Sequence, residues 1–333
     1  MVVDDTTFTG AMTVPMDDSG RLSVQLEGDA IDLDRYMAVA DEAAADAAAD
    51  VPPVEIPVDL IKPLNAQGSL KIGSVQVAGI ELENVTLGLD AANGRMRINP
   101  IAAGLYGGQY SGDIRVDVSG ATPALSFDEK IDGVDLGELA RAMFEQENVT
   151  GTVSGRFNLG GRGGDMNEIR ETLDGNVSFE LVDGTYEGTD IWWELRRARA
   201  LLRQEEPPEP TLPARTRFTS VTASGQVTDG VLTSDDLRAE LPFMQLTGSG
   251  DVDLNEGTVD YRLRARIVEK PELMGAATAD EIDDLTKTVI PLRISGPLTS
   301  PSVVPDVEDL LRQRVEEEVK EKLQDKLKDL LKR

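Results

Sequence analysis

Carboxylates are the side chains with which this sequence could do chemistry. It has 61 Asp and Glu among 333 residues, but no histidine and no cysteine. A cysteine nucleophile, a histidine base and the usual structural zinc sites are therefore excluded. So many carboxylates must form chance pairs, and none has the ligand spacing of a calcium loop or stands in a recognisable acid–base pair. We assign no catalytic residue, no metal and no cofactor.

Two enzyme-like features have simpler explanations. The stretch GGRGGD at residues 160–165 lacks the Lys-Ser/Thr ending of a P-loop and the third glycine of a dinucleotide fingerprint, so a solvent-exposed loop explains it better. A glycoside hydrolase would need paired carboxylates in a cleft rich in aromatics, whereas aromatic residues make up only 4% of the chain. We therefore expect the protein not to be an enzyme.

The composition favours a thin apolar layer over a thick globular core, because hydrophobic residues make up only 40% of the chain. The net charge of −28 disfavours nucleic acids and anionic membrane surfaces as broad docking partners, since both would be repelled. No run of 18 apolar residues is present, and the opening residues lack the basic and apolar regions of a signal peptide.

Because the sequence offers no catalytic or metal site, its main feature is the alternation of apolar and polar residues. Residues 80–118 show this alternation most clearly. Apolar residues at every second position on either side of the Asn93-Gly94 pair predict a β-hairpin. A further alternating run from Ile114 to Val118 completes a meander. One face of this sheet is apolar and the other is charged, so the question for the whole chain is what covers the apolar face.

One pattern recurs in segments that begin at Phe8, Tyr110 and Leu246: a glycine, a short alternating run, a turn and a longer alternating run. This recurrence indicates an elongated sheet of quasi-repeated strands. We predict a mainly β protein of roughly 16 to 20 strands in one antiparallel sheet, which must curl because a twisted ribbon of that length cannot stay flat. A strand is expected over residues 68–72, and a second, separate strand is expected to begin at Val75. Short helices are predicted at residues 31–37, 136–145, 166–173 and 189–203, and a charged helix at residues 306–333.

The order and spacing of several phrases are similar to the C-terminal half of the AsmA family, over residues 8–306. These phrases are LDRYM from Leu33, DLIKPLNAQGSLKIGSVQVAGIELENV from Asp59, LYGGQYSG from Leu105, DGTYEGTDIWWELRRAR from Asp183, GSGDVDLNEGTVDYRLR from Gly248 and IPLRISGPLTSPSVVPD from Ile290. The resemblance implies a TamB-related bridge-like lipid carrier, folded as a long taco-like sheet with an apolar groove.

The resemblance also implies a place and a role. It implies a periplasmic protein, held at the inner membrane by an N-terminal anchor that this sequence lacks, which takes part in phospholipid transport between the inner and outer membranes and in outer-membrane biogenesis. The expected partners are phospholipids and, beside them, outer-membrane assembly proteins, with no nucleic acid. The alternative is a scaffold or assembly factor for outer-membrane proteins that binds no lipid.

The candidate site residues are the apolar residues of the alternating strands, which would line the groove. They are Leu22, Val24, Leu26, Leu70, Ile72, Val85, Leu87, Leu89, Ile114, Val116, Val118, Val177, Phe179, Leu181, Val252, Leu254, Tyr261 and Leu263. The alternative is that these residues pack as an ordinary core. Ile191, Trp192 and Leu195 share a helix that could plug the groove or simply cover one end of the sheet.

The predicted organisation has four parts. Residues 1–40 form the end of a preceding groove segment, 41–56 a flexible linker rich in Ala, Asp and Pro, 57–302 the AsmA-like groove domain, and 303–333 the charged C-terminal helix.

Overall fold

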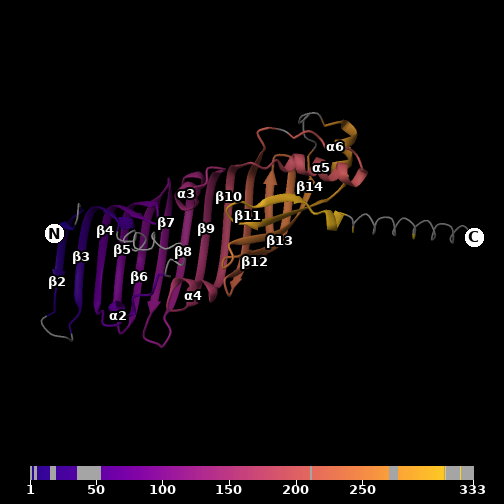
Figure 1. The fold of residues 1–333 in the computed structure, drawn as a ribbon. Helices are drawn as coiled ribbons and strands as arrows, with labels where there is room; N and C mark the ends of the chain where they lie inside the picture. Colours follow the sequence, from indigo (N-terminus) through magenta and orange to yellow (C-terminus); the bar gives the residue numbers. More distant parts are fainter. Residues whose placement is uncertain are drawn as a thin grey trace, which may run out of the picture.

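The strands of this chain form one long sheet in a computed structural model, which describes residues 2–3, 6–15, 20–35, 54–210, 212–269, 277–310, 312 and 323. The sheet has 16 strands, and their order in space follows their order in the sequence (Figure 1). Sequential pairing of this kind is what alternating runs joined by short turns favour. The predicted fold class, an elongated and curled β-sheet with a few short helices, is confirmed.

The strands are mostly eight to fourteen residues long. They are β1 (Val2–Val3), β2 (Thr6–Thr13), β3 (Leu22–Asp32), β4 (Ala66–Val77), β5 (Ile80–Ala92), β6 (Arg95–Leu105), β7 (Gly108–Asp117), β8 (Ala124–Asp135), β9 (Val149–Arg162), β10 (Asp174–Glu187), β11 (Arg215–Thr228), β12 (Val231–Leu241), β13 (Met244–Asp253), β14 (Thr258–Ile267), β15 (Ile290–Pro297) and β16 (Ser302–Pro305).

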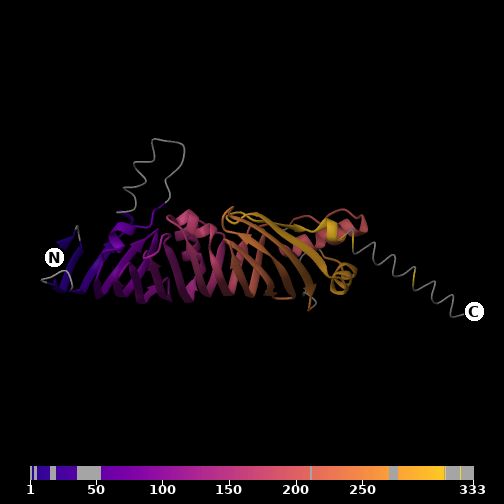
Figure 2. The same cartoon turned by 90° about the horizontal axis from the view of Figure 1, so that it is seen from below.

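In the described part of the chain, five short helices lie along the two long edges of the sheet, where the strands end. They are α2 (Val58–Ile61) and α4 (Met166–Glu171) along the lower edge of Figure 1, and α3 (Leu136–Phe144), α5 (Ile191–Arg203) and α6 (Ala279–Lys287) along the upper edge. Figure 2 shows α2, α3 and α4 on one side of the sheet, opposite its other, bare side.

Side chains just before the helices fix where they begin. Asp135 accepts a hydrogen bond from the backbone N–H of Glu138, and Asp190 accepts one from that of Trp193. Thr278 and Glu281 form a reciprocal capping box at the start of α6. The helices therefore start at defined points on the edges of the sheet.

All described strand pairs are antiparallel except β3 with β4, whose parallel register sets Leu26 opposite Leu70. Parallel neighbours need a crossover connection. The described end of that crossover, residues 54–64, follows the lower edge, where Met166 N donates to Val54 O at 3.1 Å. Ile61 then packs with Val116 and so covers the margin of the sheet.

Some sequence predictions need correction. Ile31 and Asp32 are the last residues of β3, paired with Val75 and Gln76, and do not begin a helix. Val75 does not begin a second strand, because β4 continues through it to Val77. Before β4 in the chain, β2 and β3 pair as a short antiparallel hairpin. The linker prediction for residues 41–53 and most of the predicted C-terminal helix lie outside the described residues.

Candidate functional site: the apolar face of the sheet

One face of the sheet, which we call the apolar face, is continuous across the strands. The cross-strand register connects a single row of residues from β3 to β11, running perpendicular to the strands. This row is Leu26, Leu70, Leu87, Ile101, Gly112, Glu129, Phe157, Val177 and Gly225. Eight of its nine positions are apolar, so the apolar face has no break between strands over this distance.

The register places the predicted groove residues on this one face. Leu89, Ile114 and Val252 belong to a second such row. The others follow the same alternation along their strands, and Val118 and Leu254 lie just beyond the ends of β7 and β13. The structure therefore brings the predicted residues to a common face, and their contact with lipid stays a prediction.

The middle of the apolar face is partly open, whereas its margins are covered. Leu70, Leu87 and Phe179 are only partly buried, whereas the predicted groove residues Ile72 and Val85 are 4% and 3% exposed. Near the lower edge, Val118 is 1% exposed because Ile61 and the buried Ile169 of α4 pack in the same cluster. Near the upper edge, residues of α3 pack against the cluster around Val134 and Val153.

At its C-terminal end the apolar face is closed by protein. The largest described cluster joins α5 and α6 to β12–β15, and it includes Trp192, Leu195, Tyr261, Leu263 and Leu285. Ile191 packs against the same cluster. Tyr261 and Leu263 are thus core residues here, unlike Leu70, Leu87 and Phe179, which are partly exposed. The predicted plug residues lie in this seal, and a gating role for them stays a prediction.

The sequence analysis missed one residue of this face, Glu129 on β8. Its carboxyl lies over Gly112, where an added Cβ would come within 1.9 Å of Oε2. Within the described residues neither carboxyl oxygen has a hydrogen bond of ordinary geometry. Burial raises the pKa of Glu129, the neighbouring Tyr110 hydroxyl lowers it, and Asp128 and Asp113 raise it further.

The alternation of β8 contains the signal that would have found this residue. Leu125, Phe127 and Ile131 are apolar and share the phase of Glu129, so a single carboxylate interrupts an apolar series. A charged residue in such a position is costly unless it is paired or neutral. It is therefore a candidate for function rather than part of the solvated surface.

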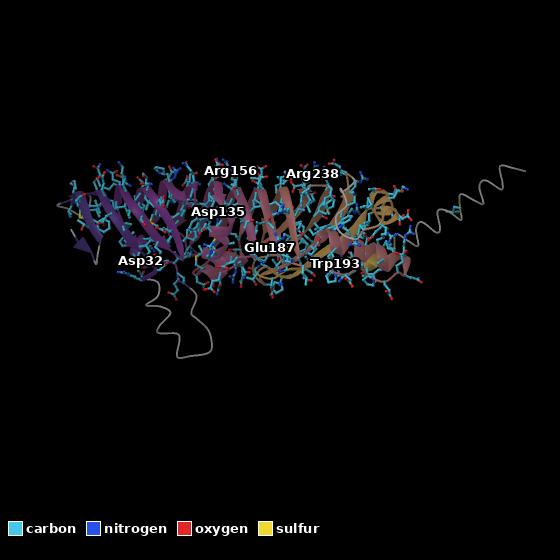
Figure 3. All side chains as sticks on the ribbon, turned by 90° about the horizontal axis from the view of Figure 1, so that it is seen from above. Asp32, Asp135, Arg156, Glu187, Trp193 and Arg238 are labelled. Carbon is cyan, nitrogen blue, oxygen red and sulfur yellow. The ribbon has the colours of Figure 1, made fainter. Side chains whose placement is uncertain are left out.

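The opposite face carries the charges. On it, Arg97 Nη2 lies 2.6 Å from Asp113 Oδ2, and Arg115 pairs with the same carboxylate. The hydrogen bond from Arg97 holds the pKa of Asp113 below its usual range. Figure 3 shows Arg156 and Arg238 on this side of the sheet, away from the helices. These ion pairs keep the outer side of the sheet in water.

Other candidate sites did not form. The GGRGGD stretch is the end of β9 followed by a turn, and Asp165 caps α4 by accepting from two backbone N–H groups. Among the described residues no group of three or more acidic side chains could hold a metal ion. No helix in that part of the chain is both long enough and apolar enough to cross a membrane.

Comparison with known proteins agrees with this architecture. The model of the AsmA family matches residues 14–237. The chain is 24% identical over 246 residues to Protein AsmA of Escherichia coli strain K12. The matched region makes up 73% of this chain and 39% of that protein. The chain thus spans about two fifths of the length of that relative. No solved structure matches. With the family model covering most of the sheet, the chain belongs to the AsmA family.

Proposed function

We propose that the apolar face binds the acyl chains of phospholipids and that the protein carries them as part of phospholipid transport between the inner and outer membranes. The observation that carries this proposal is the exposed apolar surface in the middle of the face: Leu70 and Leu87 on β4 and β5, and Val177 and Phe179 on β10, are partly exposed. Contiguous exposed apolar surface marks an interaction site.

The energetics suit acyl chains. Each buried methylene contributes about 0.8 kcal/mol, so even part of one acyl chain on this face gains several kcal/mol. At about 4.8 Å between strands, the seven strands β4–β10, which precede the closed C-terminal end, extend for about 29 Å, close to the thickness of the hydrocarbon core of a bilayer at about 30 Å. Acyl chains can therefore lie along this part of the face while their headgroups remain in water.

Family membership supports a role in the cell envelope, in outer-membrane assembly or lipid transport. Within that range we propose a periplasmic, non-enzymatic carrier, associated with the inner membrane in the full-length protein. The phospholipid is the proposed partner, and outer-membrane assembly proteins are possible further partners. The apolar lining and the absence of histidine and cysteine suit a carrier that shelters its cargo without changing it.

Native mass spectrometry with lipid extraction on the purified chain tests the proposal. We expect bound phospholipids, and we expect Leu87→Asp and Val177→Asp to abolish their recovery, because a buried carboxylate in the row repels acyl chains. Both residues are partly exposed, so the sheet should still fold. Val116→Asp should also reduce recovery, but Val116 is 7% exposed and its replacement also costs stability.

The matched control is Thr86→Asp, which places the same charge one residue away on the opposite face. Circular dichroism and thermal melting of each variant report on the fold. Lipid recovery that survives both Leu87→Asp and Val177→Asp would refute the proposed site. A lipid-free chain that co-purifies with an outer-membrane protein would instead support the scaffold alternative.

A further inference from the structure

The upper edge of the sheet has a notch between β11 and β12. The last described pair between these strands is Ser220 with Glu240, whereas β11 and β10 stay paired as far as Arg215 with Glu187. Residues 215–219 therefore have no strand partner on the β12 side in the described part of the chain. β12 and β13 stay paired with each other as far as Leu241 with Met244, so the turn between them lies beside this gap.

An apolar pocket of about 650 Å³ occupies this notch. Trp192 and Phe243 form part of its wall, with ring centroids 5.2 Å apart in an edge-to-face contact. Met244 and Leu241 line it from the β12–β13 turn, and both belong to the cluster that closes the C-terminal end of the apolar face. Leu212 lines it too and is 81% exposed, which is unusual for a leucine that no ligand covers.

Two arginines stand beside these apolar side chains. Arg215 lies 3.9 Å from Glu187, whereas Arg217 has no ion pair or hydrogen bond among the described residues. The acidic residue in the lining, Asp190, is already engaged because its Oδ1 accepts from Trp193 N at 3.1 Å. The pocket therefore combines an apolar interior with an uncommitted cation, in a chain whose net charge is −28.

The notch lies at a boundary between two parts of the apolar face. The apolar face is partly exposed over β4–β10 and closed over β12–β15, and the notch lies where these two regions meet. A lipid that moved along the face toward the C-terminal end would meet the seal at this point. An opening in the edge here offers it a lateral route.

We propose that this notch is a lateral port that binds one phospholipid, with an acyl chain in the pocket and the headgroup phosphate on Arg217. The inference rests on the proposed function and adds to it a specific site and a recognised group. Arg217 suits a phosphate because a guanidinium donates to two phosphate oxygens at once. The exposed Leu212 and the apolar wall suit the chain of the same molecule.

Trp192 supplies a probe inside the port. The chain has only two tryptophans, so Trp193→Phe leaves Trp192 as the sole fluorophore. A lysophosphatidylglycerol with a dibrominated acyl chain, used below its micelle concentration on the full chain, should quench Trp192 saturably, because bromine quenches indole only near contact. The same brominated chain as a neutral monoacylglycerol should bind about tenfold more weakly.

Two variants and one control define the site. Arg217→Gln should weaken binding about tenfold, since a hydrogen bond to a charged group contributes about 1.5–3 kcal/mol and 1.4 kcal/mol corresponds to a factor of ten. Leu212→Asp should weaken it several-fold without unfolding, because the side chain is exposed. Arg238→Gln should change nothing, because Arg238 is an exposed arginine of β12 outside the pocket.

The outcomes separate the port from the proposed function. Bound phospholipid in native mass spectra together with unquenched Trp192 would overturn the port alone. No bound phospholipid and no quenching of Trp192 would overturn both proposals. Quenching that Arg217→Gln leaves unchanged would also overturn the port, because lipid elsewhere on the apolar face would then account for it. Displacement of the lipid by equimolar glycerol phosphate would show an anion site without a chain site.

Discussion

Replacing Glu129 by Gln should stabilise the protein at neutral pH. The carboxyl of Glu129 lies on the apolar face against Gly112 and has no hydrogen bond of ordinary geometry among the described residues. The pKa of this carboxyl is raised chiefly by burial, so the folded state favours its neutral form. Glutamine has nearly the same shape but no charge, and its neutral amide costs much less to desolvate than a carboxylate.

The expected gain is about 1 kcal/mol at pH 7.5. An unsatisfied buried polar group costs about 1–3 kcal/mol, and partial exposure and the Tyr110 hydroxyl place Glu129 at the low end of that range. The sign of the pH dependence follows from the raised pKa. Below about pH 4.3 the side chain is protonated in both the folded and the unfolded protein, so wild type and variant should be equally stable. As the pH rises through the folded-state pKa, the wild type should lose stability relative to the variant.

Thermal unfolding at pH 4 and at pH 7.5 measures this difference. A gain of about 1 kcal/mol corresponds to a shift of roughly 2 °C for a domain of this size. Glu180→Gln is the matched control, because Glu180 is exposed on the polar face of β10 and its replacement should shift neither melt. A Glu129→Gln variant that is no more stable at pH 7.5, or whose gain is the same at both pH values, would refute this account of the carboxyl.

Three further changes test the packing at the ends of the sheet. Trp192→Ala should cost about 3–5 kcal/mol in the C-terminal cluster, whereas Trp192→Phe should cost much less, because the indole N–H has no acceptor among the described residues; urea unfolding distinguishes the two. Glu281→Gln should destabilise by about 3 kcal/mol, since it leaves the buried Arg196, 2.8 Å away, without its counter-charge, and the double change Arg196→Met with Glu281→Leu should recover most of the loss in thermal melts. Asp165→Ala should cost about 1 kcal/mol by removing the cap of α4, which hydrogen exchange of the backbone N–H groups of that helix would report.

The fold could be predicted from alternation because every strand of a single-layer sheet places apolar residues at every second position. Where the register shifts, the apolar positions must change from odd to even residues, or the reverse, to stay on the same face. In β6 the apolar positions run Met96 and Ile98, then Ile101 and Ala103, and the register shifts between Ile98 and Ile101. The same change occurs in β5 around Asn84, whose φ is +52°. A bulge turns the later side chains over, and the sequence changes phase with it, so the apolar face stays continuous.

Other features depend on contacts between distant segments and so escaped sequence reasoning. The parallel pairing of β3 with β4 depends on a crossover whose described end is held by hydrogen bonds near Met166, about a hundred residues later. The pocket at the notch depends on where β11 and β12 stop pairing, which no local pattern of residues specifies. Glu129 carried a local signal, but an interpretation based on apolar residues alone passes over a single carboxylate.

The architecture itself argues that the apolar face needs a partner. Domains are ordinarily built of two packed layers, and here the described helices cover only the margins and the C-terminal end of a single layer. A second sheet would have to interdigitate with this floor, because protein interiors pack closely. The floor includes side chains that lie over glycines, with the Glu129 carboxyl over Gly112 and the Phe157 ring beside Gly155. An acyl chain adapts to such a floor without a fixed fit. This favours a fluid occupant over a folded one, and quantitative lipid recovery from Gly155→Ala, whose added Cβ would lie 3.2 Å from the Phe157 ring, would agree with that preference.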